Sequence, residues 1–163
     1  MPPLKKLLLD TIAVWGLIFV NSKYHEPVMK LIKGNDIMIH IISFHELAYP
    51  AYKLESRGGL DIEMGLELFK NLKRGYDNLY NNYQILGINK LTIIPLNIRD
   101  LIDAYNLLLE EKEIFIEKRD GFWPSIADAI IATTWKKLNI TLITKDEKLI
   151  KYGEKHKLKY TKI

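Results

Sequence analysis

Cysteine is absent from the sequence and histidine is scarce. Without cysteine, the chain can form no disulfide bond, no thiolate metal site and no cysteine nucleophile, and its composition fits a cytoplasmic protein. The four histidines show no metal-ligand spacing. His45-Glu46 begins like the HExxH motif of zinc proteases, but Tyr49 stands where the second histidine is required. These absences exclude thiol chemistry, thiolate zinc sites and this protease motif.

The sequence also lacks an apolar run that could span a membrane. The run at residues 7–20 follows Lys5-Lys6 and so imitates a signal peptide, but it has 14 residues (20 − 7 + 1). A membrane-spanning helix needs roughly 20. Asp10 interrupts the run, and no small-residue cleavage site follows it. We therefore expect a buried strand followed by a helix here, and no membrane association.

The composition is that of a globular protein with a mild positive charge. The 163 residues are 48% hydrophobic and 27% charged, which predicts a single domain over residues 1–163. Lysine and arginine exceed aspartate and glutamate by 24 to 20, giving a net charge of +4. This excess favours an anionic partner but is weak support by itself.

Short apolar runs alternate with longer helical patterns along the chain. Largely continuous apolar runs, without alternation, suit strands that are covered on both faces, as in a parallel sheet. The expected strands are residues 7–9, 37–42, 91–94 and 140–143, with a short fifth at 158–160. The expected helices are 12–20, 27–33, 44–55 (broken near Pro50), 61–84, 98–110, 125–138 and 146–155, with a polar loop at 118–124. This alternation predicts an α/β fold, a three-layer α/β/α sandwich around a central parallel sheet of four to five strands.

Three acidic residues come soon after expected strands. Asp10 ends the first strand, Glu46 lies in the first turn of the helix after the second, and Asp146 follows the strand at 140–143. Ligands bind beyond the carboxyl ends of the strands in an open parallel sheet, so all three should lie at the binding edge. Each also has a structural interpretation. Asp10 and Asp146 suit helix N-caps, and Glu46 suits the positive end of a helix dipole.

A fourth acid, Asp128, lies in the first turn of a nearly all-apolar helix for which Ser125 is the expected N-cap. Asp128 shares a helix face with Ile131 and Ala132, which suggests burial. A lone buried carboxylate is costly unless it is paired or binds a metal. A structural and a functional role explain this residue about equally well.

Considered together, these four acids indicate a metal site. Grouped carboxylates repel one another and cannot all stay ionised without cations. Hard oxygen ligands select Mg²⁺ or Mn²⁺, and such sites support phosphodiester hydrolysis. The joint placement of the acids therefore predicts divalent-metal phosphodiester chemistry.

Several segments resemble motifs of the PIN-domain family, and within it of the VapC-type toxin nucleases. The likeness is strongest in SIADAIIA (125–132) and LITKDEKL (142–149), and it extends to LLDT (8–11) and SFHEL (43–47). All four acidic positions of the family are filled, in the family's order. The resemblance implies a PIN-like fold and an endoribonuclease that hydrolyses RNA with Mg²⁺ or Mn²⁺.

The resemblance also implies roles for individual residues and for partners. The catalytic and metal-binding residues would be Asp10, Glu46, Asp128 and Asp146. Thr11, Ser125 and Thr144 would hydrogen-bond these acids and orient them. The chain would be the toxin of a type II toxin–antitoxin pair, commonly a homodimer, and held inactive by a small antitoxin. We assign no protein side chain as general base.

Two alternatives remain open for the function. One is a non-catalytic PIN-fold module that binds RNA or serves as a scaffold, although a scaffold need not keep four mutually repelling carboxylates. The other is a housekeeping RNA-processing nuclease without an antitoxin. A neighbouring antitoxin reading frame would separate this nuclease from the toxin.

Basic and aromatic residues flank the acids in the sequence. The lysines could hold RNA phosphates or could form a solvated helix face; they are Lys136, Lys137, Lys145, Lys148 and Lys151. Phe122 and Trp123 could stack on an unpaired base, or could form a hydrophobic lid or a dimer contact. Surface roles are expected for two further acids, Asp120 and Glu147.

Overall fold

The computed structural model of the chain describes residues 3–48, 61–119 and 121–163. Most of the helix predicted at 44–55, its break at Pro50 and the acid Asp120 therefore lie outside the described residues. Within the described ranges, no helix is both long and apolar enough to cross a membrane.

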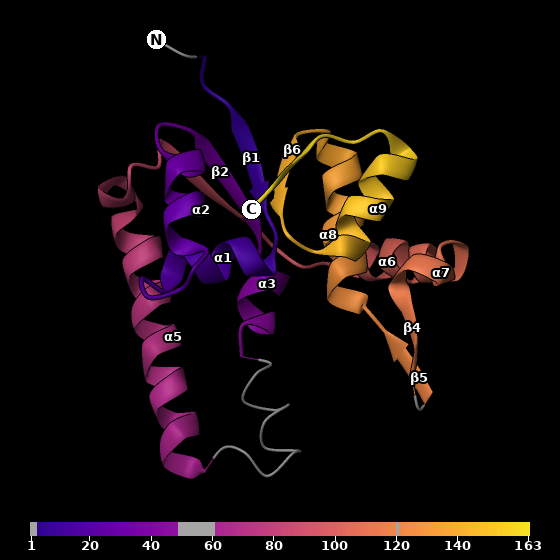
Figure 1. Cartoon of the computed structure of the whole chain (residues 1–163), viewed down its shortest axis with the longest axis horizontal. Helices are drawn as coiled ribbons and strands as arrows, with labels where there is room; N and C mark the ends of the chain where they lie inside the picture. Colours follow the sequence, from indigo (N-terminus) through magenta and orange to yellow (C-terminus); the bar gives the residue numbers. More distant parts are fainter. Residues whose placement is uncertain (1–2, 49–60, 120) are drawn as a thin grey trace.

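A five-stranded sheet in the order β3-β2-β1-β6-β7 forms the centre of the molecule (Figure 1). All of its pairings are parallel. The central strand β1 pairs with β2 on one side, where Leu8 lies opposite Met38, and with β6 on the other, where Leu8 lies opposite Leu142. The strands are β1 (Lys6–Leu9), β2 (Asp36–His40), β3 (Lys90–Ile94), β6 (Thr141–Thr144) and β7 (Tyr160–Lys162). The parallel sheet predicted from the apolar runs is confirmed.

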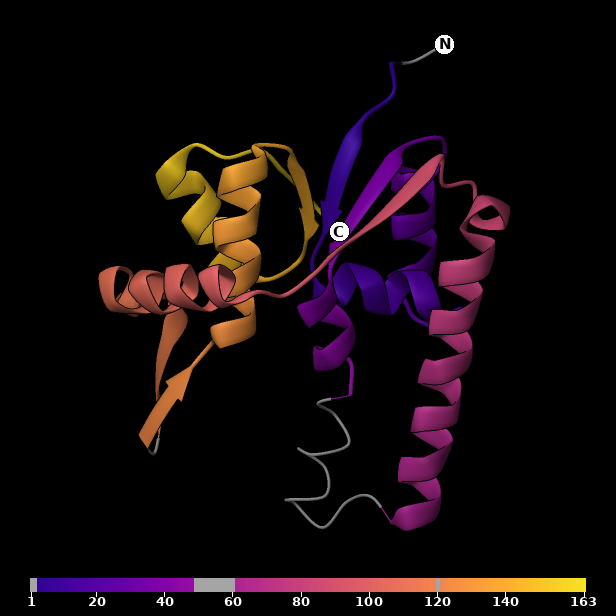
Figure 2. The same cartoon turned by 180° about the vertical axis from the view of Figure 1, so that it is seen from behind.

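Helices cover both faces of this sheet (Figures 1 and 2). One face carries α1 (Thr11–Ile18), α2 (His25–Ile32) and α5 (Ile62–Asn82), which the short helix η1 (Tyr83–Leu86) follows. The other carries α6 (Ile98–Glu110), α7 (Lys112–Phe115), α8 (Ile126–Leu138) and α9 (Glu147–His156). Alternate side chains of β1 divide between two cores, because Leu7 and Leu9 pack with the first set of helices and Leu8 with the second. The predicted three-layer sandwich is therefore confirmed.

The direction of winding reverses between β1 and β6. From β1 the chain passes to β2 and β3 on one side of the sheet, and later returns to β6 and β7 on the other side. Open α/β sheets bind ligands at such a reversal, beyond the carboxyl ends of the strands. The backbone N–H of Asp10 donates to the carbonyl of Ile143 at 3.1 Å, which fixes the two carboxyl ends side by side.

The second strand ends earlier than its apolar run predicts. Ile41 and Ile42 begin the short helix α3 (Ile41–Glu46) instead of extending β2. The imidazole Nδ1 of His40 accepts a hydrogen bond from the backbone N–H of Ile42 at 3.0 Å and so caps this helix. An apolar run alone cannot distinguish a buried strand from the start of a buried helix.

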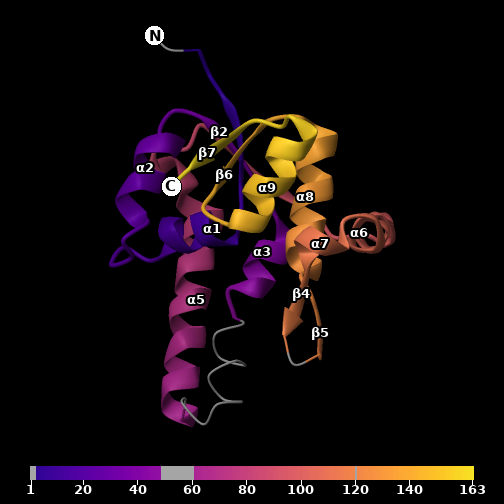
Figure 3. The ribbon, with the colours of Figure 1, turned by 45° about the vertical axis from the view of Figure 1, so that its right-hand side comes forward.

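The loop predicted at residues 118–124 is wrong, because this region forms an antiparallel hairpin. Its strands are β4 (Ile116–Arg119) and β5 (Gly121–Pro124). The hairpin projects beyond α8, away from the sheet (Figures 1 and 3). The sequence holds a signal for this hairpin, the dipeptide Asp120-Gly121, which is typical of hairpin turns.

Helices α8 and α9 meet so closely that only glycine fits at position 153. A Cβ atom added to Gly153 would lie 2.2 Å from Cη2 of Trp135. The indole cannot retreat easily, because its N–H donates to the carbonyls of Ile140 at 2.9 Å and Lys159 at 3.1 Å. We expect Gly153→Ala to lower the free energy of unfolding by about 1–3 kcal/mol despite the better helix propensity of alanine.

Urea denaturation measures this effect, and Gly65→Ala in α5 is the matched control. Among the described residues, no atom outside the neighbouring residues and backbone of α5 itself lies within 4 Å of a Cβ added at Gly65, so this change should stabilise the protein by up to about 1 kcal/mol. Equal stabilities of the two variants would contradict the packing argument.

Candidate active site

Asp10 lies at the carboxyl end of β1 and caps α1. Its Oδ1 accepts from the backbone N–H of Ala13 at 2.8 Å, and its Oδ2 accepts from the hydroxyl of Thr144. The residue is 2% exposed. Burial raises the pKa of Asp10 to about 6, although both hydrogen bonds act in the opposite direction. The helix-cap interpretation of Asp10 is thus correct, and the same carboxylate lies at the sheet edge.

Asp146 caps α9 and is joined to Asp10 through Thr144. Its Oδ1 accepts from the backbone N–H groups of Lys148 at 2.8 Å and Leu149 at 3.1 Å. The Thr144 hydroxyl donates to Asp10 and accepts from the backbone N–H of Asp146 at 3.0 Å. A single threonine therefore fixes two acids from different elements relative to each other.

Glu46 is the last residue of α3 and does not lie in the first turn of a helix. A negative charge gains nothing from the dipole at a helix C-terminus, so the dipole interpretation of this residue is wrong. The Thr11 hydroxyl donates to Oε1 of Glu46 at 2.6 Å. Burial and the negative charge of Asp146 raise the pKa of Glu46.

Asp128 lies in the first turn of α8, and its side chain is 16% exposed. Burial is the largest cause that raises its pKa well above the usual range, followed by the charges of Asp146 and Glu46. Ser125 occupies the N-cap position of α8, but its side chain makes no capping hydrogen bond, contrary to the prediction. Its backbone N–H donates to the carbonyl of Phe115 at 2.8 Å instead.

The structure brings all four acids into one electrostatic cluster. We call Asp10, Glu46, Asp128 and Asp146 the acid cluster. The charge of Asp146 raises the pKa of each of the other three, and Asp10 and Glu46 both raise that of Asp128. The cluster lies at the carboxyl edge where β1 and β6 run side by side. Thr11 and Thr144 hydrogen-bond members of the cluster, whereas Ser125 makes no side-chain hydrogen bond to a described residue.

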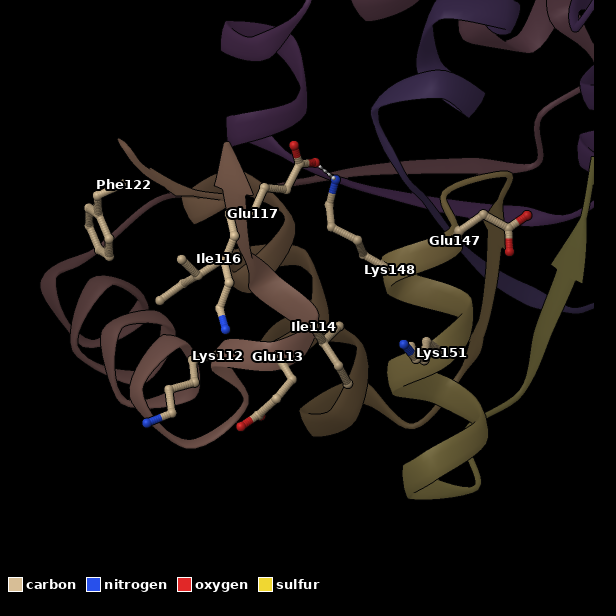
Figure 4. Close-up of a pocket in the computed structure, with 10 residues that line it drawn as sticks. Lys112, Glu113, Ile114, Ile116, Glu117, Phe122, Glu147, Lys148 and Lys151 are labelled. Carbon is tan, nitrogen blue, oxygen red and sulfur yellow. Dashed lines mark hydrogen bonds and ion pairs between the residues drawn. The ribbon is translucent and has the colours of Figure 1, made fainter. Parts of the chain in front are cut away.

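A cation within this cluster was missed by sequence reasoning. The ammonium Nζ of Lys148 in α9 lies 3.5 Å from Oδ2 of Asp128 and 3.7 Å from Oδ2 of Asp146. It also donates to Oε1 of Glu117 in β4 at 3.4 Å (Figure 4). Burial alone would lower the pKa of Lys148, but the charges of Asp128 and Asp146 raise it. The signal in the sequence was its position, two residues after a capping acid, in the first turn of a helix.

The donor chemistry of the acid cluster fits a hard divalent cation. Four carboxylates against the one ammonium of Lys148 would leave a charge of −3 if all were ionised, and the pKa values of three of the acids are raised. Oxygen donors of this charge are those that Mg²⁺ and Mn²⁺ prefer. The acids do not form a complete set of metal ligands in this structure. Among the described residues, no three acidic or histidine side chains are close enough together to hold one ion.

Lys148 should stabilise the metal-free protein. Replacing it by Met leaves Asp128 and Asp146 without their counter-charge, and we expect the free energy of unfolding at neutral pH in EDTA to fall by about 1–2 kcal/mol. Lys151→Met, one turn further along α9, is the control, because Lys151 forms no salt bridge with a described residue. Urea denaturation measures both variants. A loss of equal size in the two would show that Lys148 does not neutralise the cluster.

The chain matches the family model described as the PIN domain over residues 7–155. Its fold is similar to that of VapBC2 from Rickettsia felis, bound to a promoter DNA fragment, at 21% identity and a TM-score of 0.56, with 96% of this chain and 98% of that chain covered. FitAcB from Neisseria gonorrhoeae has 18% identity and a TM-score of 0.54, with 94% and 95% covered. VapBC-1 from nontypeable Haemophilus influenzae has 17% identity and a TM-score of 0.50, with 96% and 97% covered. No curated protein matches the chain.

Proposed function

The chain belongs to the PIN domain family, and from that membership we propose that it is an endoribonuclease that depends on Mg²⁺ or Mn²⁺. One observation carries this proposal. Acids at the end of β1, in α3, in α8 and at the start of α9 meet at one edge of the sheet, where the charge of Asp146 raises the pKa of each of the other three. A purely structural role would not require four acids to share one partly buried place, since each could serve as a cap or surface charge elsewhere.

Under this proposal, Asp10, Glu46, Asp128 and Asp146 hold the metal directly or through water. A bound Mg²⁺ or Mn²⁺ would supply Lewis acidity at the phosphate to be cleaved. Thr11 and Thr144 keep the carboxyl groups of Glu46 and Asp10 in fixed orientations through their hydroxyls. Lys148 supplies a positive charge beside Asp128 and Asp146, where an RNA phosphate must approach.

The test is RNA cleavage with the metal as the variable. We expect the purified chain to cut RNA in Mg²⁺ or Mn²⁺ and to lose this activity in EDTA, because the acids alone repel the phosphate. Labelled structured and unstructured RNAs, separated on denaturing gels, give the readout. Cleavage that persists in EDTA would contradict the metal mechanism, and the absence of cleavage with either metal would contradict the proposed enzymatic function.

The resemblance to VapC-type nucleases supports three finer parts of the proposal. The chain would be the toxin of a type II toxin–antitoxin pair, it would act as a cytoplasmic homodimer, and a small antitoxin would hold it inactive. Light scattering tests the dimer. A neighbouring reading frame whose product co-purifies with this chain and suppresses cleavage tests the antitoxin, and its absence would favour the housekeeping nuclease.

A non-catalytic RNA-binding module is favoured by one observation, the position of Lys148. Its ammonium lies beside Asp128 and Asp146, where a metal ion would otherwise neutralise these acids. Such a module would bind RNA in EDTA and in Mg²⁺ alike and would cut it in neither. The cleavage assay separates the two functions.

A further inference from the structure

A groove of about 920 Å³ lies beside the acid cluster (Figure 4). Its walls come from α7 and the β4–β5 hairpin on one side and from α9 on the other. This volume is within the range of cavities that hold a ligand of nucleotide size. Lys148 belongs to both places, since it lines the groove and contacts Asp128. A ligand in the groove therefore reaches the edge of the acid cluster.

Three of the four free charges in this groove are positive, and the fourth is that of Glu113, which forms no salt bridge with a described residue. Lys112, Lys118 and Lys151 line it, and none of them forms a salt bridge with a described residue. Two of the acids that line it are already paired, Glu117 with Lys148 at 3.4 Å and Glu147 with Lys162 at 3.1 Å. The groove thus offers three unpaired ammonium groups to a polyanion. Phosphates of a nucleic-acid backbone are bound by lysines arranged in this way.

An aromatic side chain stands next to these charges. The hairpin register places Phe122 directly opposite Lys118, so the two lie on the same face of the hairpin. Phe122 is 72% exposed although it is large and apolar. An exposed ring beside a cation can stack on an unpaired base while the cation binds the adjoining phosphate. A paired base in a duplex offers no free face for such stacking.

The other face of the hairpin is directed to the cluster. Trp123 lies opposite Glu117, which accepts a hydrogen bond from Lys148. Trp123 is 53% exposed. The hairpin therefore carries one aromatic ring on each face, and only Phe122 of the two lines the groove.

We propose that this groove binds a single-stranded segment of RNA next to the cleavage point. Lys112, Lys118 and Lys151 hold its phosphates, and Phe122 stacks on one of its bases. The inference deepens the proposed ribonuclease function and rests on it for the identity of the ligand as RNA. It adds the surface outside the acid cluster that holds the strand, and the residues of this chain that favour an unpaired one.

The experiment measures binding without cleavage, by fluorescence anisotropy in EDTA. The probes are a short labelled oligouridine and an RNA duplex of the same length. The groove variant combines Lys112→Gln, Lys118→Gln and Lys151→Gln. The control combines Lys33→Gln, Lys70→Gln and Lys90→Gln, which removes the same charge from exposed positions near α2, α5 and β3. Phe122→Ala is compared with Phe69→Ala, an aromatic of α5 that is 47% exposed.

We expect the groove variant to bind oligouridine at least about tenfold more weakly than the control triple variant. Its slope of log K against log salt should fall by about 2, since each single-strand phosphate contact contributes about 0.7. Phe122→Ala should weaken binding by between about 5-fold and 100-fold, and Phe69→Ala should leave it unchanged. The duplex should bind more weakly than the single strand.

The result that would overturn the inference is equal binding by the groove variant and the control triple variant, or binding of the duplex as tight as that of the single strand. This failure is distinct from a failure of the proposed function. If the chain cuts RNA in Mg²⁺ and the groove variants bind and cut as the controls do, the groove inference is wrong and the ribonuclease stands. If oligouridine binds through the groove and no metal supports cleavage, the groove stands and the ribonuclease is wrong.

Discussion

Asp128→Asn is expected to lower RNA cleavage by about 10³-fold or more while leaving the fold intact. Among the described residues, the only ion pair of this carboxylate is with Lys148, and it caps no helix. Substitution by Asn therefore removes the charge and its ion pair with Lys148 but no helix cap. Loss of a residue that acts as part of a catalytic group costs several powers of ten in rate. Of the four acids, Asp128 is therefore the one whose substitution best tests a catalytic role without disturbing the fold.

The measurement is single-turnover cleavage of labelled RNA in Mg²⁺ or Mn²⁺, with thermal unfolding in EDTA as the check on folding. Because the pKa of Asp128 is raised well above its usual range, the neutral Asn variant should be at least as stable as the wild type at neutral pH. Asp77→Asn, which neutralises an exposed acid of α5, is the matched control and should cut RNA at the wild-type rate. Unchanged cleavage by Asp128→Asn would remove this residue from the active site.

Asp10→Asn should make the metal-free protein more stable at neutral pH, with a difference that disappears in acid. Burial raises the pKa of Asp10 from 3.8 to about 6. Between these values the unfolded chain loses the proton while the folded chain keeps it, so stability falls as the pH rises. Above about pH 6 the carboxyl group of Asp10 is ionised in both the folded and the unfolded chain. Its burial then lowers the free energy of unfolding by about 3 kcal/mol. Asn keeps the cap to Ala13 and carries no charge.

Urea denaturation in EDTA at several pH values measures this difference. The free energies of unfolding of the wild type and Asp10→Asn should agree within error near pH 3, where the Asp10 carboxyl group is largely protonated in both the folded and the unfolded chain. They should diverge between about pH 4 and pH 6. Added Mg²⁺ should raise the stability of the wild type more than that of the variant, because a ligand that binds only the folded state stabilises it. If the free energies of unfolding of the two proteins differed by the same amount at every pH, the raised pKa of Asp10 would not be the cause of the difference.

The parts of the fold that follow from burial on both faces could be predicted from the sequence. The run Leu7-Leu8-Leu9 is apolar at every position because its side chains enter two different cores, and this pattern is typical of a central parallel strand. The acids after β1 and β6 could be predicted to lie together for the same reason. Parallel strands place their carboxyl ends at one edge, so topology alone brings Asp10 close to Asp146.

Other features depend on contacts between distant segments and could not be predicted in this way. Glu46 was placed at the wrong end of its helix, because the side chain of His40 ends β2 and caps α3 within the run at residues 37–42 that was predicted to be one strand. Lys148 could be named as one of the lysines that flank the acids, but its ion pairs could not be predicted, because its partners Asp128 and Glu117 come from α8 and β4. The hairpin was missed because its strands have only four residues each and its large apolar residues Phe122 and Trp123 are exposed, so they form no buried apolar run.

The pairing of β1 with β6 makes the order of synthesis matter. Asp10 and Thr144, which meet in the folded protein, are 134 residues apart in the sequence. On the ribosome the first strand emerges long before the strand that pairs with it. Until residues 141–146 have left the exit tunnel, Asp10 lacks Thr144 and the cluster lacks Asp146. The nuclease proposed here is therefore inert during most of its own translation, because incomplete chains that end before β6 contain at most three of the four acids and no assembled site.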